Sequence, residues 1–174
     1  MHSAYIAIGT NIEPRLERMH QAFDSLVQFG SIEKKSSIYE TAPYGFTEQA
    51  NFLNAVVLLR TELDLASIHS ALKTLENELG RTERQRWHER EIDFDILFYD
   101  DVIMNSLLLT VPHKELQNRS FVLVPLNEIA SDFLHPILKK NISSLLEELQ
   151  YDKNSIQLVE PTFSRLAPAE SRSH

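Results

Sequence analysis

Apolar residues recur along the chain at two spacings, and the order of these spacings predicts the order of strands and helices. Short apolar or alternating runs predict strands, whereas apolar residues three and four positions apart predict amphipathic helices. Strands are predicted at residues 4–9, 32–39, 52–60, 92–99 and 156–159, with a short edge at 102–104 that pairs back on the strand before it. Helices are predicted at residues 14–29, 65–79, 120–129 and 142–149.

The first six elements follow the order strand, helix, strand, strand, helix, strand, which is the split βαβ pattern of ferredoxin-like α+β domains. We therefore predict an α+β fold with a ferredoxin-like antiparallel sheet flanked by helices and extra helices at the C-terminal end. A chain of 174 residues is long enough to build one hydrophobic core. Residues 1–163 are predicted to form this single domain, and residues 164–174 a loosely ordered tail.

Residues 81–99 concentrate the charged side chains from which a function can be argued. Four of the ten arginines of the chain, Arg81, Arg84, Arg86 and Arg90, fall within ten positions. In the strand that follows, period-two alternation places two aspartates side by side on one face. The two predicted faces are Ile92, Phe94, Ile96 and Phe98 on one side and Asp93, Asp95, Leu97 and Tyr99 on the other.

Carboxylates next to arginines predict a site for a metal-bound polyphosphate. Asp93 and Asp95 offer the oxygen ligands that hard divalent cations prefer. The arginine side chains suit phosphate, which a guanidinium group can bind with two parallel hydrogen bonds. Because the chain has only four glycines, it contains neither a Walker loop nor a dinucleotide-binding fingerprint. A bound nucleotide must therefore be held by cationic side chains and metal ions.

The charge balance and the lack of cysteine exclude several classes of protein. A formal net charge of −8 argues against a general binder of nucleic acids or acidic membranes. Without cysteine there is neither a disulfide framework nor a thiolate metal site. The N-terminal segment turns polar too early for a secretory signal, and no apolar run reaches transmembrane length. We expect a cytoplasmic monomer with neither nucleic-acid nor membrane partners.

Seven groups of residues occur together in the order and approximate spacing of one enzyme family. They are YIAIGTN, SSIYETAPYG with EQANFLNAVV, LENELGR, RWHEREIDFDIL, LTVPH, NRSFVLVPLNEIA and a following His-Pro. On these motifs, across residues 5–136, the chain resembles the 6-hydroxymethyl-7,8-dihydropterin pyrophosphokinases of folate biosynthesis. The resemblance implies a diphosphotransferase that moves pyrophosphate from Mg-ATP to the hydroxymethyl group of 6-hydroxymethyl-7,8-dihydropterin and releases AMP.

The resemblance also implies a role for each matching residue. Asp93 and Asp95 would hold two Mg²⁺ ions that bridge the ATP phosphates, and with Arg86 and Arg90 they would form the catalytic set. The implied pterin-binding residues are Thr41, Ala42, Tyr44, Phe52, Asn54 and Phe121, where the phenylalanines stack on the ring and the amide reads its polar edge. The implied ATP-binding residues are Glu76, Arg84, Arg86, Arg90, Ile96, Thr110, His113 and Arg119.

The sequence departs from the family pattern in three places around the expected ATP site. Glu83 stands where a second arginine is usual, with Arg84 one position later, and Leu108 replaces a common basic residue. His88-Glu89 replaces a Gly-Pro pair. Losing a hydrogen bond to a charged group costs roughly 1.5–3 kcal/mol, so we expect a slower but working enzyme.

Two classes of function remain open from the sequence. The alternative to the enzyme is a non-catalytic ferredoxin-like module that binds a pterin or nucleotide or acts in regulation, because a fold does not fix a function. In that case Phe52 and Phe121 would be core aromatics and His113 a structural turn residue. The intact Asp93 and Asp95 pair beside the arginines favours the enzyme.

Overall fold

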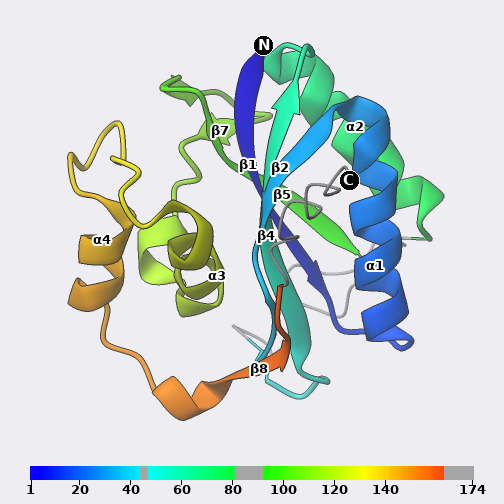
Figure 1. Cartoon of the computed structure of the whole chain (residues 1–174), viewed down its shortest axis with the longest axis vertical. Helices are drawn as coiled ribbons and strands as arrows, with labels where there is room; N and C mark the ends of the chain where they lie inside the picture. The colour runs from blue at the N-terminus through cyan, green and yellow to red at the C-terminus, as the bar shows by residue number, and fades with distance from the viewer. Residues whose placement is uncertain (44–46, 81–91, 163–174) are drawn as a thin grey trace, which may run out of the picture.

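Two long strands, β1 (His2–Thr10) and β4 (Phe52–Thr61), pair antiparallel in the middle of the sheet. The computed structural model describes residues 1–43, 47–80 and 92–162, and over these residues it contains a six-stranded antiparallel sheet (Figure 1). The order across the sheet is β5–β1–β4–β3–β8, and β2 also pairs with β4. The shorter strands are β2 (Ser31–Lys35), β3 (Ile38–Thr41), β5 (Asp93–Tyr99) and β8 (Ile156–Glu160).

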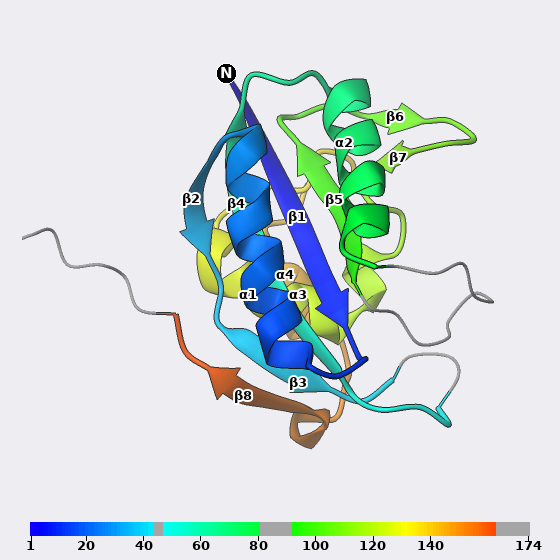
Figure 2. The ribbon, with the colours of Figure 1, turned by 90° about the vertical axis from the view of Figure 1, so that its right-hand side faces the viewer.

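Helices cover both faces of this sheet. Among the described residues, α1 (Arg15–Leu26) and α2 (Leu65–Glu78) pack on one face, and α3 (Ser120–Ala130) and α4 (Ile142–Glu148) lie on the other (Figures 1 and 2). The predicted ferredoxin-like α+β fold with extra C-terminal helices is therefore confirmed. None of these helices combines the length and apolar character needed to cross a membrane. Short 3₁₀ turns occur at Val27–Phe29, Leu116–Asn118 and Lys153–Ser155.

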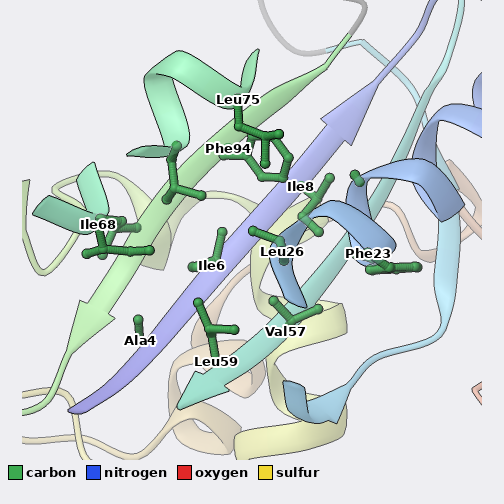
Figure 3. Close-up of a cluster of buried hydrophobic side chains, with 14 of the residues drawn as sticks. Ala4, Ile6, Ile8, Phe23, Leu26, Val57, Leu59, Ile68, Leu75 and Phe94 are labelled. Atoms are coloured by element: carbon green, nitrogen blue, oxygen red, sulfur yellow. The ribbon is translucent and has the colours of Figure 1, made fainter. Parts of the chain in front are cut away.

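The central strands are buried on both faces, in two separate apolar clusters. Along β4, Leu53, Ala55, Val57 and Leu59 face α1 and α2, whereas Val56 and Leu58 face α3 and α4. Figure 3 shows part of the cluster on the α1 and α2 side. Burial on both faces explains why this strand is a continuous apolar run instead of an alternating one.

The single strand predicted at residues 32–39 is divided into β2 and β3. Ser36 causes the division, because its hydroxyl oxygen accepts the backbone N–H of Val56 at 2.8 Å in place of a backbone carbonyl. The pairing with β4 shifts as a result: Lys35 lies opposite Val57 and Tyr39 opposite Asn54. Four residue steps from Lys35 to Tyr39 thus lie opposite three residue steps along β4.

β5 alternates as predicted only as far as Ile96, because the strand contains a β-bulge. The register with β1 skips Leu97, which has no partner of its own in that ladder. Leu97 and Phe98 both lie in the cluster beside α3 and α4, and Tyr99 returns to the cluster beside α1 and α2. The predicted faces are therefore wrong for Phe98 and Tyr99.

The edge predicted at residues 102–104 does not pair back on β5. Over the described residues, β6 (Met104–Asn105) pairs with β7 (Thr110–Val111) in a separate ribbon. Asp100 turns the chain away: it has a positive φ of 47°, its N–H donates to the carbonyl of Ser3, and its carboxylate accepts the N–H of Ser3. The predicted tail at 164–174 lies outside the described residues.

Candidate functional site

A pocket on the α3 side of the sheet is lined by most of the predicted site residues that the structure describes. It opens where the C-terminal end of β1, the N-terminal ends of β4 and β5, and the start of α3 meet. Every described residue of the predicted pterin and metal sets contributes to its wall. The lining residues are Ala7, Ile8, Gly9, Thr41, Ala42, Phe52, Asn54, Ala55, Asp93, Asp95, Arg119, Phe121 and Val122.

Strand register brings these side chains together from distant parts of the sequence. Gly9 lies opposite Asn54 on the β4 side and opposite Asp93 on the β5 side, so the three form one row across the sheet. In the next row on this face, Ala7 lies opposite Asp95. Two small residues of β1 therefore form the floor between an amide and two carboxylates.

Gly9 keeps this floor open. A Cβ atom at this position would lie 3.2 Å from Oδ1 of Asn54 and 3.9 Å from the ring of Phe52. The first distance is shorter than an ordinary van der Waals contact, so any larger side chain would displace the amide or fill the pocket. Gly9 was not among the predicted site residues, although it lies in the YIAIGTN motif.

Asn54 is a buried amide with a fixed orientation. Its Nδ2 atom donates a hydrogen bond of 2.6 Å to the hydroxyl oxygen of Thr41, which is also buried. The amide oxygen consequently lies over Gly9, inside the pocket. Half-buried Phe52 and Phe121 contribute apolar walls from β4 and α3. Such a combination suits a flat, polar-edged heterocycle.

The two aspartates lie in the same pocket, as the alternation predicts. Burial, and then the neighbouring charge of Asp93, raise the pKa of Asp95 to about 7. Asp95 keeps some contact with solvent, but the protein around it removes enough water to destabilise the ionised carboxylate. A cation between the two carboxylates would remove that penalty, so the donor set fits a divalent metal ion.

Only part of a metal coordination shell comes from the described residues. Within residues 1–43, 47–80 and 92–162, no group of three or more His, Asp or Glu side chains is arranged to hold a metal ion. Mg²⁺ typically takes one or two carboxylates and completes its octahedron with water and substrate phosphates. The Asp93 and Asp95 pair matches that type of site.

Glu76 lies outside the pocket lining, on the α2 side of β5. Its side chain is 3% exposed, and its Oε1 atom accepts the backbone N–H of Phe94 at 2.8 Å. The ammonium group of Lys73, one helical turn earlier, lies 3.2 Å from the same oxygen and 3.3 Å from the carbonyl oxygen of Phe94. Phe94 is the residue between the two aspartates.

The other described residues of the predicted ATP set surround the β5 side of the pocket. Arg119 precedes α3, lines the pocket and places its guanidinium 5.8 Å from the centre of the Phe121 ring. Burial, and then the charge of Arg119, lower the pKa of His113 to about 4, so the imidazole is neutral at pH 7. Thr110 is half-buried on β7, and the Ile96 side chain belongs to the core.

Four predicted site residues, Tyr44, Arg84, Arg86 and Arg90, lie outside the described residues. The same holds for the departures from the family pattern at 83 and 88–89. The arginine half of the site therefore stays a prediction from the sequence.

Comparison with known proteins identifies the family that the sequence of this chain matches. The profile of the family described as 7,8-dihydro-6-hydroxymethylpterin-pyrophosphokinase matches residues 5–131. A 2-amino-4-hydroxy-6-hydroxymethyldihydropteridine pyrophosphokinase of Aquifex aeolicus is 39% identical over 148 residues, covering 85% of this chain and 92% of the relative. A protein of the same name from Haemophilus influenzae is 41% identical over 138 residues, covering 78% of this chain and 86% of the relative.

The fold also matches a solved structure. The wild-type HPPK-DHPS of Plasmodium falciparum superposes with a TM-score of 0.70 over 84% of this chain at 15% sequence identity. This chain spans 44% of that protein. At such low identity the likeness supports the fold alone.

Proposed function

This chain belongs to the 7,8-dihydro-6-hydroxymethylpterin-pyrophosphokinase family, and from that premise we propose that its pocket holds the pterin and Mg-ATP side by side. The chain is an ATP-dependent pyrophosphokinase of folate synthesis: it transfers the pyrophosphoryl group of ATP to the hydroxymethyl group of 6-hydroxymethyl-7,8-dihydropterin. The observation that carries the proposed arrangement is the single pocket lined by Phe52, Asn54, Asp93 and Asp95.

The pterin occupies the part of the pocket between β4 and α3. Phe52 and Phe121 stack on its faces, because aromatic rings bind flat heterocycles by dispersion and quadrupole interactions. Asn54 reads the polar edge with its amide, held in orientation by Thr41. The backbone of Thr41, Ala42 and Tyr44 supplies further hydrogen bonds to the same edge.

Asp93 and Asp95 would hold the two Mg²⁺ ions that accompany ATP. When bound, these ions neutralise the phosphate charge and orient the β-phosphoryl group. A pKa near 7 for Asp95 supports this assignment, because the buried carboxylate needs a positive partner to stay ionised. Arg119 lines the same pocket and adds a fixed cation for the phosphates.

The nucleotide binds along the outer side of β5. Ile96 contacts it through the backbone, because the Ile96 side chain is buried in the core. His113 donates a hydrogen bond from Nε2, since its Nδ1 accepts the N–H of Glu115 at 3.2 Å and the ring is neutral. Thr110 and Arg84 complete the ATP contacts, and Glu76 supports the site from behind β5.

The chemistry needs positioning and charge neutralisation more than a covalent intermediate. The hydroxymethyl oxygen attacks the β-phosphorus in line with the bridging oxygen of the α-phosphate. A bond forms between the hydroxymethyl oxygen and the β-phosphorus as the bridging bond breaks. AMP leaves with the electron pair of that bond, and the hydroxyl proton passes to solvent. Arg86, Arg90 and Arg119 stabilise the charge that develops on the phosphates.

AMP release from ATP and Mg²⁺, with and without the pterin, tests this assignment. Wild type should release AMP only with pterin present, and Asp95→Ala should lower the rate by on the order of a hundredfold, because a ligand of the charge-neutralising ions is lost. Asp101→Ala, an exposed aspartate after the other end of β5, is the matched control and should match wild type. Equal rates for Asp95→Ala and wild type would contradict the proposed metal site.

A further inference from the structure

Over the described residues, β5 is an edge strand where it carries the two aspartates. It pairs with β1 on one side, and α2 lies beside its other side in Figure 2. An edge strand presents backbone N–H and C=O groups without a strand partner, and a buried group of this kind must find another partner or lose stability. Phe94 is 1% exposed, so its backbone N–H and C=O both need a hydrogen-bond partner other than water.

Two side chains of α2 take the place of the missing strand at Phe94. The carboxylate of Glu76 accepts the N–H of Phe94 at 2.8 Å, and the ammonium of Lys73 donates to the carbonyl oxygen of Phe94 at 3.3 Å. The two side chains also contact each other at 3.2 Å, as expected for positions three apart on a helix. We refer to Lys73 and Glu76 together as the α2 clamp.

The clamp acts on both peptide planes that lead to the aspartates. The N–H of Phe94 belongs to the peptide that joins it to Asp93, and the C=O of Phe94 belongs to the peptide that joins it to Asp95. Because a peptide unit is planar, fixing these two groups fixes the Cα atoms of both aspartates. The directions in which the two carboxylates enter the pocket follow from those positions.

We propose that Glu76 and Lys73 are positioning residues that hold Asp93 and Asp95 in the geometry needed to bind the metal ions of Mg-ATP. This inference rests on the proposed function of the aspartate pair. Ligand-bearing residues must be held to within about 0.5 Å for productive binding, and rigid support behind them provides that precision. Glu76 thereby acts through the backbone of Phe94, from the side of β5 opposite the pocket.

Binding of Mn²⁺ with a non-hydrolysable ATP analogue, followed by calorimetry, measures the effect on the metal site. Glu76→Ala removes the acceptor for the Phe94 N–H and should weaken Mn²⁺ binding by about tenfold to a hundredfold, as expected for loss of a charge-assisted hydrogen bond. Glu76→Gln keeps an acceptor oxygen and should restore binding to within about threefold of wild type. Lys73→Met keeps the aliphatic stem and should weaken binding by about threefold to tenfold, since Lys73 is partly exposed.

Two further readouts separate positioning from a general loss of structure. Hydrogen exchange of the Phe94 amide, followed by NMR without metal, should accelerate in Glu76→Ala and remain slow in Glu76→Gln. The dissociation constant of the pterin analogue alone should not change in either variant, because the clamp lies outside the pterin walls. Glu78→Gln, an exposed glutamate on the same helix, is the matched control for both readouts.

These measurements distinguish failure of the clamp proposal from failure of the proposed metal site. If wild type binds no Mn²⁺ with the nucleotide analogue, the aspartate metal site is wrong and the clamp proposal is overturned with it. If wild type binds and folded Glu76→Ala binds equally well, the clamp proposal alone is overturned. Equal losses in Glu76→Gln and Glu76→Ala would also overturn it, because charge and not the hydrogen bond would then be responsible. Should Glu76→Ala not fold, the other two variants decide. Unchanged Mn²⁺ binding in Lys73→Met, or a loss of more than about threefold in Glu76→Gln, would then overturn the clamp proposal.

Discussion

At the scale of single residues, the site depends on one position with no side chain. Gly9 lies in the same row as Asn54 and Asp93, so its backbone is the surface on which a ligand would rest. The polar groups of this row were predicted from the sequence, because amides and carboxylates indicate chemistry by their type. Gly9 was not predicted, because the effect of an absent side chain depends on the neighbouring strands.

We predict that Gly9→Val raises the KM for the pterin by about tenfold or more and changes the KM for ATP little. The new side chain would meet Oδ1 of Asn54, where a Cβ alone would approach to 3.2 Å. Overpacking of this kind typically costs roughly 1–3 kcal/mol. Steady-state kinetics with each substrate varied in turn checks the result. Ala66→Val, at an exposed position of α2, is the control; an equal rise in both KM values for Gly9→Val would contradict the prediction.

At the scale of elements, α3 connects the pocket with the far edge of the sheet. Its first turn supplies Phe121 and Val122 to the pocket wall. Near its other end, the Glu128 carboxylate accepts hydrogen bonds from the N–H and hydroxyl of Ser37 and the hydroxyl of Tyr39. The helical pattern predicted α3 correctly despite its internal proline. These contacts were not predicted, because they join residues about ninety positions apart.

Removing this connection should loosen α3 against β3. We predict that Glu128→Ala lowers the free energy of unfolding by about 1–2 kcal/mol, since three hydrogen bonds are lost at a partly solvated site. The pKa of Tyr39, which burial and the Glu128 bond raise, should fall in the same variant. Urea denaturation measures the first change and ultraviolet titration of tyrosine the second. Glu147→Ala, at an exposed position of α4, should leave both unchanged.

At the scale of the whole molecule, the two faces of the sheet have different tasks. Apolar side chains fill the α1 and α2 side, whereas the α3 side leaves a pocket at one end of the central strands. Burying polar groups around this pocket links stability to pH. Among the described histidines, His113 has the most strongly lowered pKa, about 4, and therefore the strongest link between stability and pH.

We predict that stability contributed through His113 is present above about pH 6.5 and is lost as the pH falls toward 4. The unfolded histidine binds a proton near pH 6.5, and burial, then Arg119, lower the folded pKa to about 4. Between these values the unfolded state binds more protons, so acid favours unfolding. The unfolding free energy of wild type minus that of His113→Gln, measured from pH 7.5 to 4.5 with no nucleotide present, should decrease as the pH falls. A constant difference across this range would contradict the assignment.

Patterns along the sequence predicted the main helices and strands in order, the fold class and the aspartates shared by one face of β5. These features depend on periodicity and residue type, which neighbours along the chain encode. Four features arise only when the strands and helices pack together: the bulge at Leu97, the division at Ser36, the row through Gly9 and the α2 clamp on Phe94. Each of these depends on the register between strands or on contacts between distant elements. Such contacts follow from the packing of the whole core, which no local spacing specifies.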